Sequence, residues 1–241
     1  MDKYWLERTE LLIKEEGLDK LIKANVLVVG LGGVGSFAAE FLARAGVGNM
    51  TIVDGDTVDI TNINRQLPAL HSTVGKHKVD VVAERLLDIN PLLNLTKINE
   101  FLNPERMDEV LDSAKFDYVL DCIDSVTPKL SLIIAAKRRR IKIVSSMGAG
   151  GKTDPSKVLV RDISKTEHCH LARQVRKRLK KVKIDKGVRC VFANDIQDEE
   201  SLKMTDGTNY KRSFYGTISY MPAIFGLYTA SEVINHLLNQ D

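Results

Sequence analysis

The sequence predicts an α/β fold built on a doubly wound, mainly parallel sheet. Short β-branched runs that end at Gly, Asp or Asn alternate with longer helical patterns, which is typical of βαβ units. After residue 147 the alternation ends, and two further short runs predict antiparallel additions toward the C-terminus. At 241 residues, with 44% hydrophobic and 28% charged residues, the chain has the size and composition of one globular domain.

The predicted elements follow one another in a regular order. β-branched residues dominate each predicted strand, and the segments between the strands have the length and apolar spacing of helices. Ligands of such sheets bind at the carboxyl ends of the strands, so the residues that follow the strands are the first candidates for a site. The predicted strands are 25–30, 49–54, 95–99, 118–122 and 142–147, the helices lie near 33–45, 76–90, 104–114 and 128–139, and the added strands are 157–163 and 188–193.

A run of 19 uncharged residues at 213–231 approaches the length of a membrane span. Gly216, Pro222 and Gly226 interrupt this run and polar side chains dilute it, whereas a strong span is almost entirely aliphatic. We therefore expect no membrane span but a buried helix that starts near Pro222, because proline suits a first helical turn.

Charge and cysteine content narrow the function classes. The net charge is only +3, so nucleic-acid binding requires a local basic patch. Cys122, Cys169 and Cys190 form no CxxC pair, which argues against a disulfide framework and a four-cysteine zinc site. The N-terminus lacks the pattern of a secretory signal. A cytoplasmic location is expected.

A glycine-rich turn, VLVVGLGGVGS, lies between the first predicted strand and the first predicted helix after it. Glycine lets the backbone turn tightly and approach a phosphate, while the helix that follows offers free N–H groups. Asp54 ends the next strand, where a carboxylate accepts hydrogen bonds from a ribose. These features predict a Rossmann-like nucleotide site. The glycines of the turn, which match GxGxxG with one addition, are Gly30, Gly32, Gly33 and Gly35.

The residues after Asp54 distinguish a triphosphate from a dinucleotide. The stretch TNINRQ supplies Asn62, Arg65 and Gln66, and Lys78 follows in GKHK. Cations that converge on phosphates stabilise the charge that develops when a bond to the α-phosphorus is exchanged, as in adenylate formation. We therefore expect ATP rather than NAD, with both cations exposed on loops.

Two carboxylates follow the fourth predicted strand in LDCIDS. Asp121 closes the strand, and Asp124 lies in the loop beyond it. A carboxylate at this edge is placed to hold Mg²⁺, and the loop position favours Asp124. The alternative role for Asp124 is a helix cap before Pro128.

The motifs GLGGVGS, VDGD, TNINRQ, VGKHK and DCIDS occur in this order, and residues 4–149 therefore resemble the ThiF/MoeB/HesA adenylating family, relatives of the ubiquitin-activating enzymes. The resemblance implies that Gly32 and Gly33 approach the phosphates and that Gln66 helps to fix the arginine loop. It also implies a homodimer in which Arg8 reaches the ATP of the neighbouring subunit; an exposed helix charge is the alternative. The remaining implied roles are Asp54 for the ribose, Asn62, Arg65 and Lys78 for phosphate charge, and Asp124 for magnesium.

The resemblance extends to one branch of this family. The protein-activating branch commonly carries two CxxC pairs for zinc, and both are absent here. Instead, SVTPK, SSMGAGGKTDPSK, DISKT and YGTISYMPAIFG are similar to the dehydratases that act on threonylcarbamoyladenosine in the anticodon loop of tRNA. This likeness implies ATP, Mg²⁺ and tRNA as ligands. A link to a cysteine desulfurase and sulfur-acceptor system rests on the likeness alone.

A basic segment indicates a nucleic-acid partner independently of the resemblance. Residues 173–189 contain nine Lys or Arg and one Asp. Basic helices are often only solvated faces, but so unbalanced a run in a nearly neutral protein favours contact with phosphates. The residues expected to bind tRNA are Arg176, Lys177, Lys180 and Lys181.

The leading hypothesis is a single adenylating domain. Its parts are an N-terminal helical arm at 1–25, a nucleotide-binding half at 26–149 and a substrate-binding and dimer half at 150–241. ATP would activate the threonyl carboxylate of the modified adenosine, with Arg65, Lys78 and Asp124 in catalytic roles. The alternatives are adenylation of a ubiquitin-like sulfur-carrier protein, which the missing CxxC pairs disfavour, and an NAD-binding or nucleotide-sensing module, which the two cations disfavour.

Overall fold

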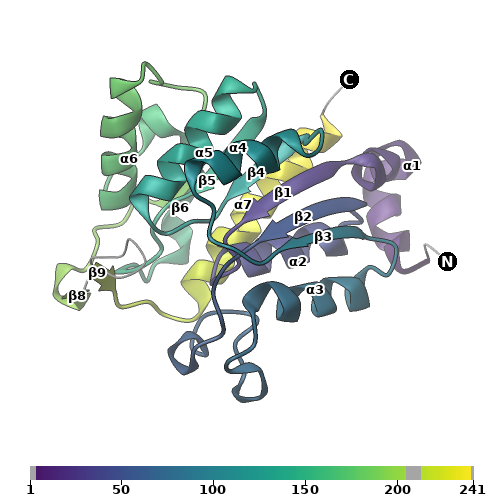
Figure 1. The fold of residues 1–241 in the computed structure, drawn as a ribbon, viewed down its shortest axis with the longest axis horizontal. Coiled ribbons are helices and arrows are strands. Elements are labelled where there is room, and N and C mark those ends of the chain that lie inside the picture. The colour runs from purple at the N-terminus through teal and green to yellow at the C-terminus, as the bar shows by residue number, and fades with distance from the viewer. Residues whose placement is uncertain (1–3, 205–212, 240–241) are drawn as a thin grey trace.

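The computed structural model of the protein describes residues 4–204 and 213–239; the other residues of the predicted arm and C-terminal half lie outside this description. A seven-stranded sheet in the order β3-β2-β1-β4-β5-β7-β6 forms its centre (Figure 1). The order reverses between β1 and β4, which is where doubly wound sheets bind ligands. The strands are β1 (Asn25–Val29), β2 (Asn49–Val53), β3 (Asn94–Ile98), β4 (Tyr118–Asp121), β5 (Lys142–Ser146), β6 (Val158–Asp162) and β7 (Arg189–Ala193).

The predicted fold class is confirmed, with one refinement near the C-terminus. Of the two added strands, β7 extends the parallel sheet, with Ser145 opposite Cys190, and only β6 runs antiparallel to its neighbour. A second antiparallel pair, β8 (Leu202–Met204) with β9 (Ser213–Tyr215), stands apart from the main sheet. The direction of β7 could not be predicted, because a run of five mostly apolar residues is compatible with both parallel and antiparallel pairing.

Helices cover both faces of the sheet (Figure 1). Alternate residues of β1 enter two different cores: Val26 and Val28 pack on one face, and Leu27 and Val29 on the other. This alternation follows from the two-residue period of a strand. The first face carries α1 (Glu7–Lys23), α2 (Gly35–Arg44), α3 (Lys78–Ile89) and α7 (Tyr220–Leu238), and the second carries α4 (Pro104–Asp112), α5 (Val126–Arg138) and α6 (His170–Lys181).

Helix α7 accounts for most of the uncharged run. It begins at Tyr220, so Pro222 lies in its first turn as expected, and Phe225 and Thr229 are fully buried. A Cβ added at Gly226 would lie 2.6 Å from the carbonyl oxygen of Val34, so α7 packs directly on the start of α2. Among the described residues, no helix has the length and apolar character needed to cross a membrane.

The N-terminal arm consists of η1 (Tyr4–Leu6) and α1, which is kinked at Lys14 with a φ of 64°. Leu6 is buried and approaches Gly46, a residue between α2 and β2. The arm therefore lies at the amino ends of the strands, opposite the loops that follow them (Figure 1). Trp5, the only tryptophan of the chain, is 41% exposed there.

Candidate active site

The glycine-rich turn occupies the carboxyl end of β1. Gly30 has a φ of 91°, a conformation that side chains rarely adopt. A Cβ on Gly30 would also lie 2.9 Å from the carbonyl oxygen of Cys122, and one on Gly35 would lie 1.8 Å from that of Gly30. Glycine is therefore required at Gly30 for both conformation and space, and at Gly35 for close packing of α2 on β1.

Neither Gly33 nor Gly32 has a positive φ, and only Gly33 lies where a side chain would lack space. A Cβ on Gly33 would lie 3.0 Å from the carbonyl oxygen of Arg65 and 2.9 Å from Pro222, so the turn lies between the arginine loop and α7. Among the described residues, no backbone carbonyl accepts the N–H of Gly32 or Gly33. Both N–H groups are thus available to a phosphate.

Asp54 braces this turn from the end of β2. Its Oδ2 accepts a hydrogen bond from the N–H of Leu31 at 2.6 Å, and its Oδ1 accepts one from the N–H of Asp56 at 2.8 Å. Burial raises the pKa of Asp54, and the positive charge of Lys78 opposes the rise. Each carboxylate oxygen retains a second lone pair, so a ribose hydroxyl would add to these bonds rather than replace them.

Asn62 organises the loop that carries the predicted arginine. It ends η2 (Ile60–Asn62), and its backbone carbonyl accepts the N–H of Arg65 at 3.0 Å and that of Gln66 at 2.9 Å. The side-chain Nε2 of Gln66 lies 3.6 Å from the Cβ position of Gly32. Asn62 and Gln66 therefore join the arginine loop to the glycine turn.

Arg65 and Asp124 interact electrostatically although 59 positions separate them in the sequence. Burial lowers the pKa of Arg65, and the negative charge of Asp124 acts in the opposite direction. Arg65 Nη1 donates to the carbonyl of Thr61 at 2.9 Å. Asp124 is exposed and precedes Ser125, the N-cap residue of α5, so Asp124 does not occupy the N-cap position of that helix.

Lys78 is buried, which corrects the expectation of an exposed loop cation. Only 5% of the residue is exposed, and its Nζ lies 2.9 Å from Asp56 Oδ2. The correction arises because the chain folds back at a bridge between Thr57 and His77, which places Lys78 at the first turn of α3. Its charge therefore acts beside Asp54 rather than on a solvated loop.

A buried ion pair that sequence reasoning missed lies beneath these loops. Lys129 and Asp121 are both 0% exposed, and Lys129 Nζ lies 2.8 Å from Asp121 Oδ2. Lys129 also donates to the carbonyl of Ser146 at 2.9 Å, and Ser145 donates to Asp121. These bonds hold the carboxylate of Asp121 in the core. Asp124 is therefore the exposed carboxylate of the LDCIDS stretch.

Comparison with known proteins identifies the family. The model of the ThiF family matches residues 6–241. The chain belongs to the ThiF family. It is 41% identical to the tRNA threonylcarbamoyladenosine dehydratase of Bacillus subtilis (strain 168) over 238 residues, which cover 96% of this chain and 93% of that protein. It is 38% identical to the enzyme of the same name from Escherichia coli (strain K12), with 97% and 94% covered.

Solved structures agree with this assignment to the ThiF family. The crystal structure of the E. coli tRNA N6-threonylcarbamoyladenosine dehydratase, TcdA, in complex with ATP has a TM-score of 0.87 and 36% identity to this chain. The match covers 98% of this chain and 96% of that one. The complex of the same enzyme with AMP has a TM-score of 0.88.

Arg8 does not join the glycine turn of its own chain. In this ThiF-family protein it is exposed on α1, at the end of the sheet opposite the loops that carry Arg65 and Asp124 (Figure 1). A role for Arg8 in adenylation therefore requires a second copy of the chain.

The basic segment forms α6 only as far as Lys181. Lys177, Lys180 and Lys181 are exposed on this helix, as expected for phosphate contacts. Arg176 instead donates through Nη1 to the carbonyl of Thr166 at 2.7 Å. Arg189 belongs to β7 and pairs with Glu232 at 2.6 Å. The lysines are thus the accessible part of the predicted tRNA surface.

Proposed function

We propose that this protein uses ATP to dehydrate N6-threonylcarbamoyladenosine in tRNA, closing its side chain into a ring. The observation that carries the proposal is the match along almost the whole chain to proteins named for this reaction, at 41% identity over 96% of the chain for the B. subtilis enzyme. The ATP complex of TcdA supports ATP as the activating nucleotide.

The site is suited to adenylation. The threonyl carboxylate attacks the α-phosphorus of ATP and pyrophosphate leaves, which gives an acyl-adenylate. A nucleophile of the same side chain then attacks the acyl carbon, its proton passes to solvent, and AMP leaves with the carboxylate oxygen. The free N–H groups of Gly32 and Gly33 and the cation of Arg65 offer the positive charge that the first step needs. The second step is intramolecular and requires no protein nucleophile.

Asp124 is the residue proposed to hold Mg²⁺. Its exposed carboxylate follows β4 and faces the charge of Arg65, whereas Asp121 is committed to Lys129. Among the described residues there is no group of three side chains able to hold a metal without help. Magnesium commonly binds through one or two carboxylates together with substrate phosphates and neutralises their charge.

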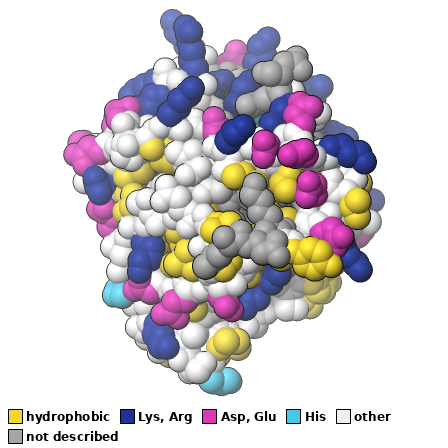
Figure 2. Space-filling model, turned by 90° about the vertical axis from the view of Figure 1, so that its right-hand side faces the viewer, with side chains coloured by type: hydrophobic (Ala, Val, Ile, Leu, Met, Phe, Trp, Pro, Cys, Tyr) yellow, Lys and Arg dark blue, Asp and Glu magenta, His cyan; other side chains and the backbone are white. Residues whose placement is uncertain are grey.

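A homodimer is the proposed assembly, with Arg8 reaching the partner's ATP. Figure 2 shows hydrophobic side chains gathered within a charged border on the face that carries the N-terminal arm. Large exposed apolar patches typically mark interaction surfaces. Exposed apolar residues of the arm are Tyr4, Trp5, Leu11 and Leu12, which are 71%, 41%, 68% and 82% exposed.

The cytoplasm is the proposed location, in keeping with three free cysteines. Burial raises the pKa of the fully buried Cys190 well above its ordinary value, so this thiol is inert.

One assay tests the proposed function. Purified protein is incubated with ATP, Mg²⁺ and tRNA that carries threonylcarbamoyladenosine, and the digested nucleosides are analysed by mass. We expect a product lighter by one water, formed only with ATP. Unchanged nucleoside, together with ATP-dependent adenylation of a sulfur-carrier protein, would overturn the proposal.

A further inference from the structure

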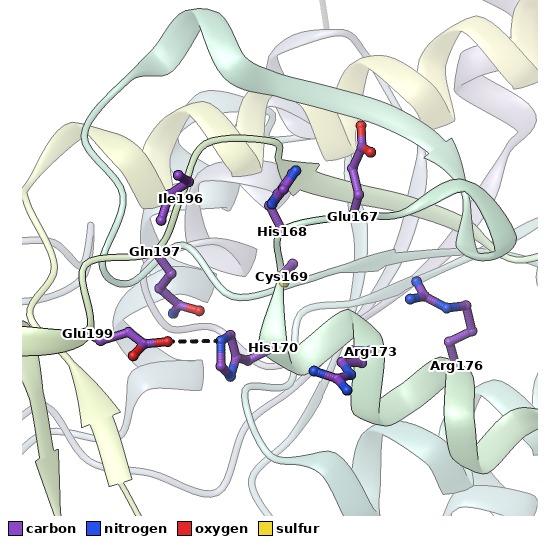
Figure 3. A pocket seen from close by; sticks show the side chains of 9 residues that line it. All are labelled: Glu167, His168, Cys169, His170, Arg173, Arg176, Ile196, Gln197 and Glu199. Atoms are coloured by element: carbon purple, nitrogen blue, oxygen red, sulfur yellow. Dashed lines mark ion pairs between the residues drawn. The ribbon is translucent and has the colours of Figure 1, made fainter.

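A pocket of about 280 Å³ opens between the start of α6 and the loop that follows β7 (Figure 3). Residues 167–170 and two arginines of α6 form one wall, and Ile196, Gln197 and Glu199 form the other. None of these residues belongs to the loops after β1, β2 or β4. The pocket is therefore separate from the glycine turn and from Asp124.

Hydrogen bonds connect this pocket to the edge of the sheet that carries the candidate active site. Gln197 Nε2 donates to the carbonyl of Gly150 at 2.9 Å, and the N–H of Asp198 donates to that of Gly151 at 2.9 Å. These glycines follow β5, which pairs with β4, the strand that leads to Asp124. The pocket thus lies farther along the same carboxyl edge.

A buried lysine fixes the two walls relative to each other. Lys152 is only 2% exposed, and its Nζ donates to the carbonyl of His168 at 2.9 Å. The same Nζ lies 3.2 Å from Asp195 Oδ1 on the opposite wall. The space is therefore preorganised rather than a gap between mobile loops.

Two polar groups that line the pocket lack a partner among the described residues. The side chain of Arg173 is exposed, and its guanidinium makes no hydrogen bond or ion pair with any described residue, while the guanidinium of Arg176 donates to Thr166. Gln197 Oε1 is buried and accepts no hydrogen bond from a described residue, although the bond from Nε2 to Gly150 fixes the amide. Figure 3 shows this amide directed toward His170. The guanidinium of Arg173 can bind an anion, and the buried carbonyl oxygen of Gln197 can accept a hydrogen bond from a ligand.

We propose that the pocket receives one ribonucleotide of the tRNA, with its phosphate at Arg173 and its 2′-hydroxyl donating to Gln197 Oε1. A phosphodiester alone has no donor for Gln197, whereas a ribonucleotide provides both the anion and the donor. The first turn of α6 favours the same charge, because its N-cap residue Cys169 makes no capping side-chain bond. The 2′-hydroxyl is the group that distinguishes RNA from DNA at a contact of this kind. This inference rests on the proposed function, since it assumes an RNA substrate.

Two variants test the two contacts separately. The probe is an anticodon stem-loop RNA, compared with the same molecule carrying 2′-deoxyribose throughout its loop, and the readout is the dissociation constant at several salt concentrations. Arg173→Ala should weaken RNA binding about fivefold and lower the salt slope by about 0.7, the value for one phosphate on a single strand. Gln197→Met should leave the salt slope unchanged and reduce the preference for RNA over the deoxy probe.

The matched control is Arg138→Ala, which removes the same charge from an exposed site at the end of α5 and should leave both probes unaffected. Unchanged RNA affinity in Arg173→Ala, or an unchanged RNA preference in Gln197→Met, would overturn the pocket assignment while wild-type turnover upholds the proposed function. Inorganic phosphate that competes with the RNA only through Arg173, with no effect of the 2′-hydroxyl, would reduce the pocket to an anion site. A wild-type protein that neither binds nor converts tRNA would instead refute the proposed function.

Discussion

Asp121 and Asp124 are three residues apart but have opposite environments. Burial raises the pKa of Asp121, and Lys129, its ion-pair partner, opposes the rise. The carboxylate of Asp124 is exposed beyond the end of β4. Although both residues are aspartates, their surroundings differ. Asp121 is part of the buried core, whereas the carboxylate of Asp124 is exposed and can bind a ligand.

Asp124→Asn should strongly reduce magnesium-dependent turnover while the protein remains folded. The amide keeps the shape of the side chain but lacks the charge that a hard cation requires, and we expect a loss of about 100-fold in kcat at limiting magnesium. The free energy of unfolding should change by less than about 0.5 kcal/mol because the side chain is exposed. Full activity at limiting magnesium would remove Asp124 from the site.

Arg65→Ala and Lys78→Ala should differ in their effect on stability. Both should lose turnover, because both cations lie beside the proposed phosphate position. Lys78→Ala should also lower the free energy of unfolding by about 1 to 3 kcal/mol, because it removes a buried charge paired with Asp56. Arg65 is only partly buried, so its loss should cost about 1 kcal/mol or less. Denaturant unfolding of the two variants measures the difference, and equal destabilisation would contradict it.

At the level of secondary structure, local patterns predicted most of the fold. The strands from β1 to β5 end within one residue of their expected positions, because β-branched runs bounded by Gly, Asp or Asn are strong local signals. The glycine turn was predictable for the same reason. The burial of Lys78 and the pair of Asp121 with Lys129 were not, because each depends on contacts between segments that no local periodicity records.

The contact between α2 and α3 predicts a specific pH dependence. Burial by itself raises the pKa of Glu40, but Arg85 and Arg44 outweigh it and hold the pKa below its ordinary value of 4.5. A lowered carboxyl pKa contributes stability above the unfolded-state value, and that contribution is lost as pH falls through the folded-state value. Glu40→Gln should therefore destabilise the protein by about 1 to 3 kcal/mol at neutral pH. Denaturant melts should show the difference shrinking below pH 4.5; a gap that stays constant there would exclude ionised Glu40 as its source.

The exposed lysines of α6 should contribute affinity without contributing to stability. Replacing Lys177, Lys180 and Lys181 together with Ala should lower the salt slope of tRNA binding by about 2 to 3, because fewer counterions are released. ATP binding by calorimetry should be unaltered. Arg176→Ala, the contrasting variant, should lower the melting temperature because its guanidinium ties α6 to the loop at Thr166. If the triple variant binds tRNA as the parent does, this face is only solvated.

At the level of the whole molecule, the position of Arg8 allows a complementation test of the dimer. Arg8→Ala and Arg65→Ala should each be inactive alone. In a mixed dimer, one site combines intact Arg65 from one subunit with intact Arg8 from the other. Random mixing makes half of the dimers mixed, so activity should recover to about a quarter of the wild-type value. Turnover after subunit exchange measures this, and no recovery despite exchange would show that Arg8 does not act across subunits.

The place of Trp5 gives the arm a built-in spectroscopic reporter. It is the only indole in the chain, it is 41% exposed, and it lies three residues from Arg8. Intrinsic fluorescence excited through tryptophan therefore comes from a single position on the surface proposed for assembly. A blue shift of its emission with rising protein concentration would follow the arm as it leaves water, and the concentration at the midpoint would give the association constant without any label.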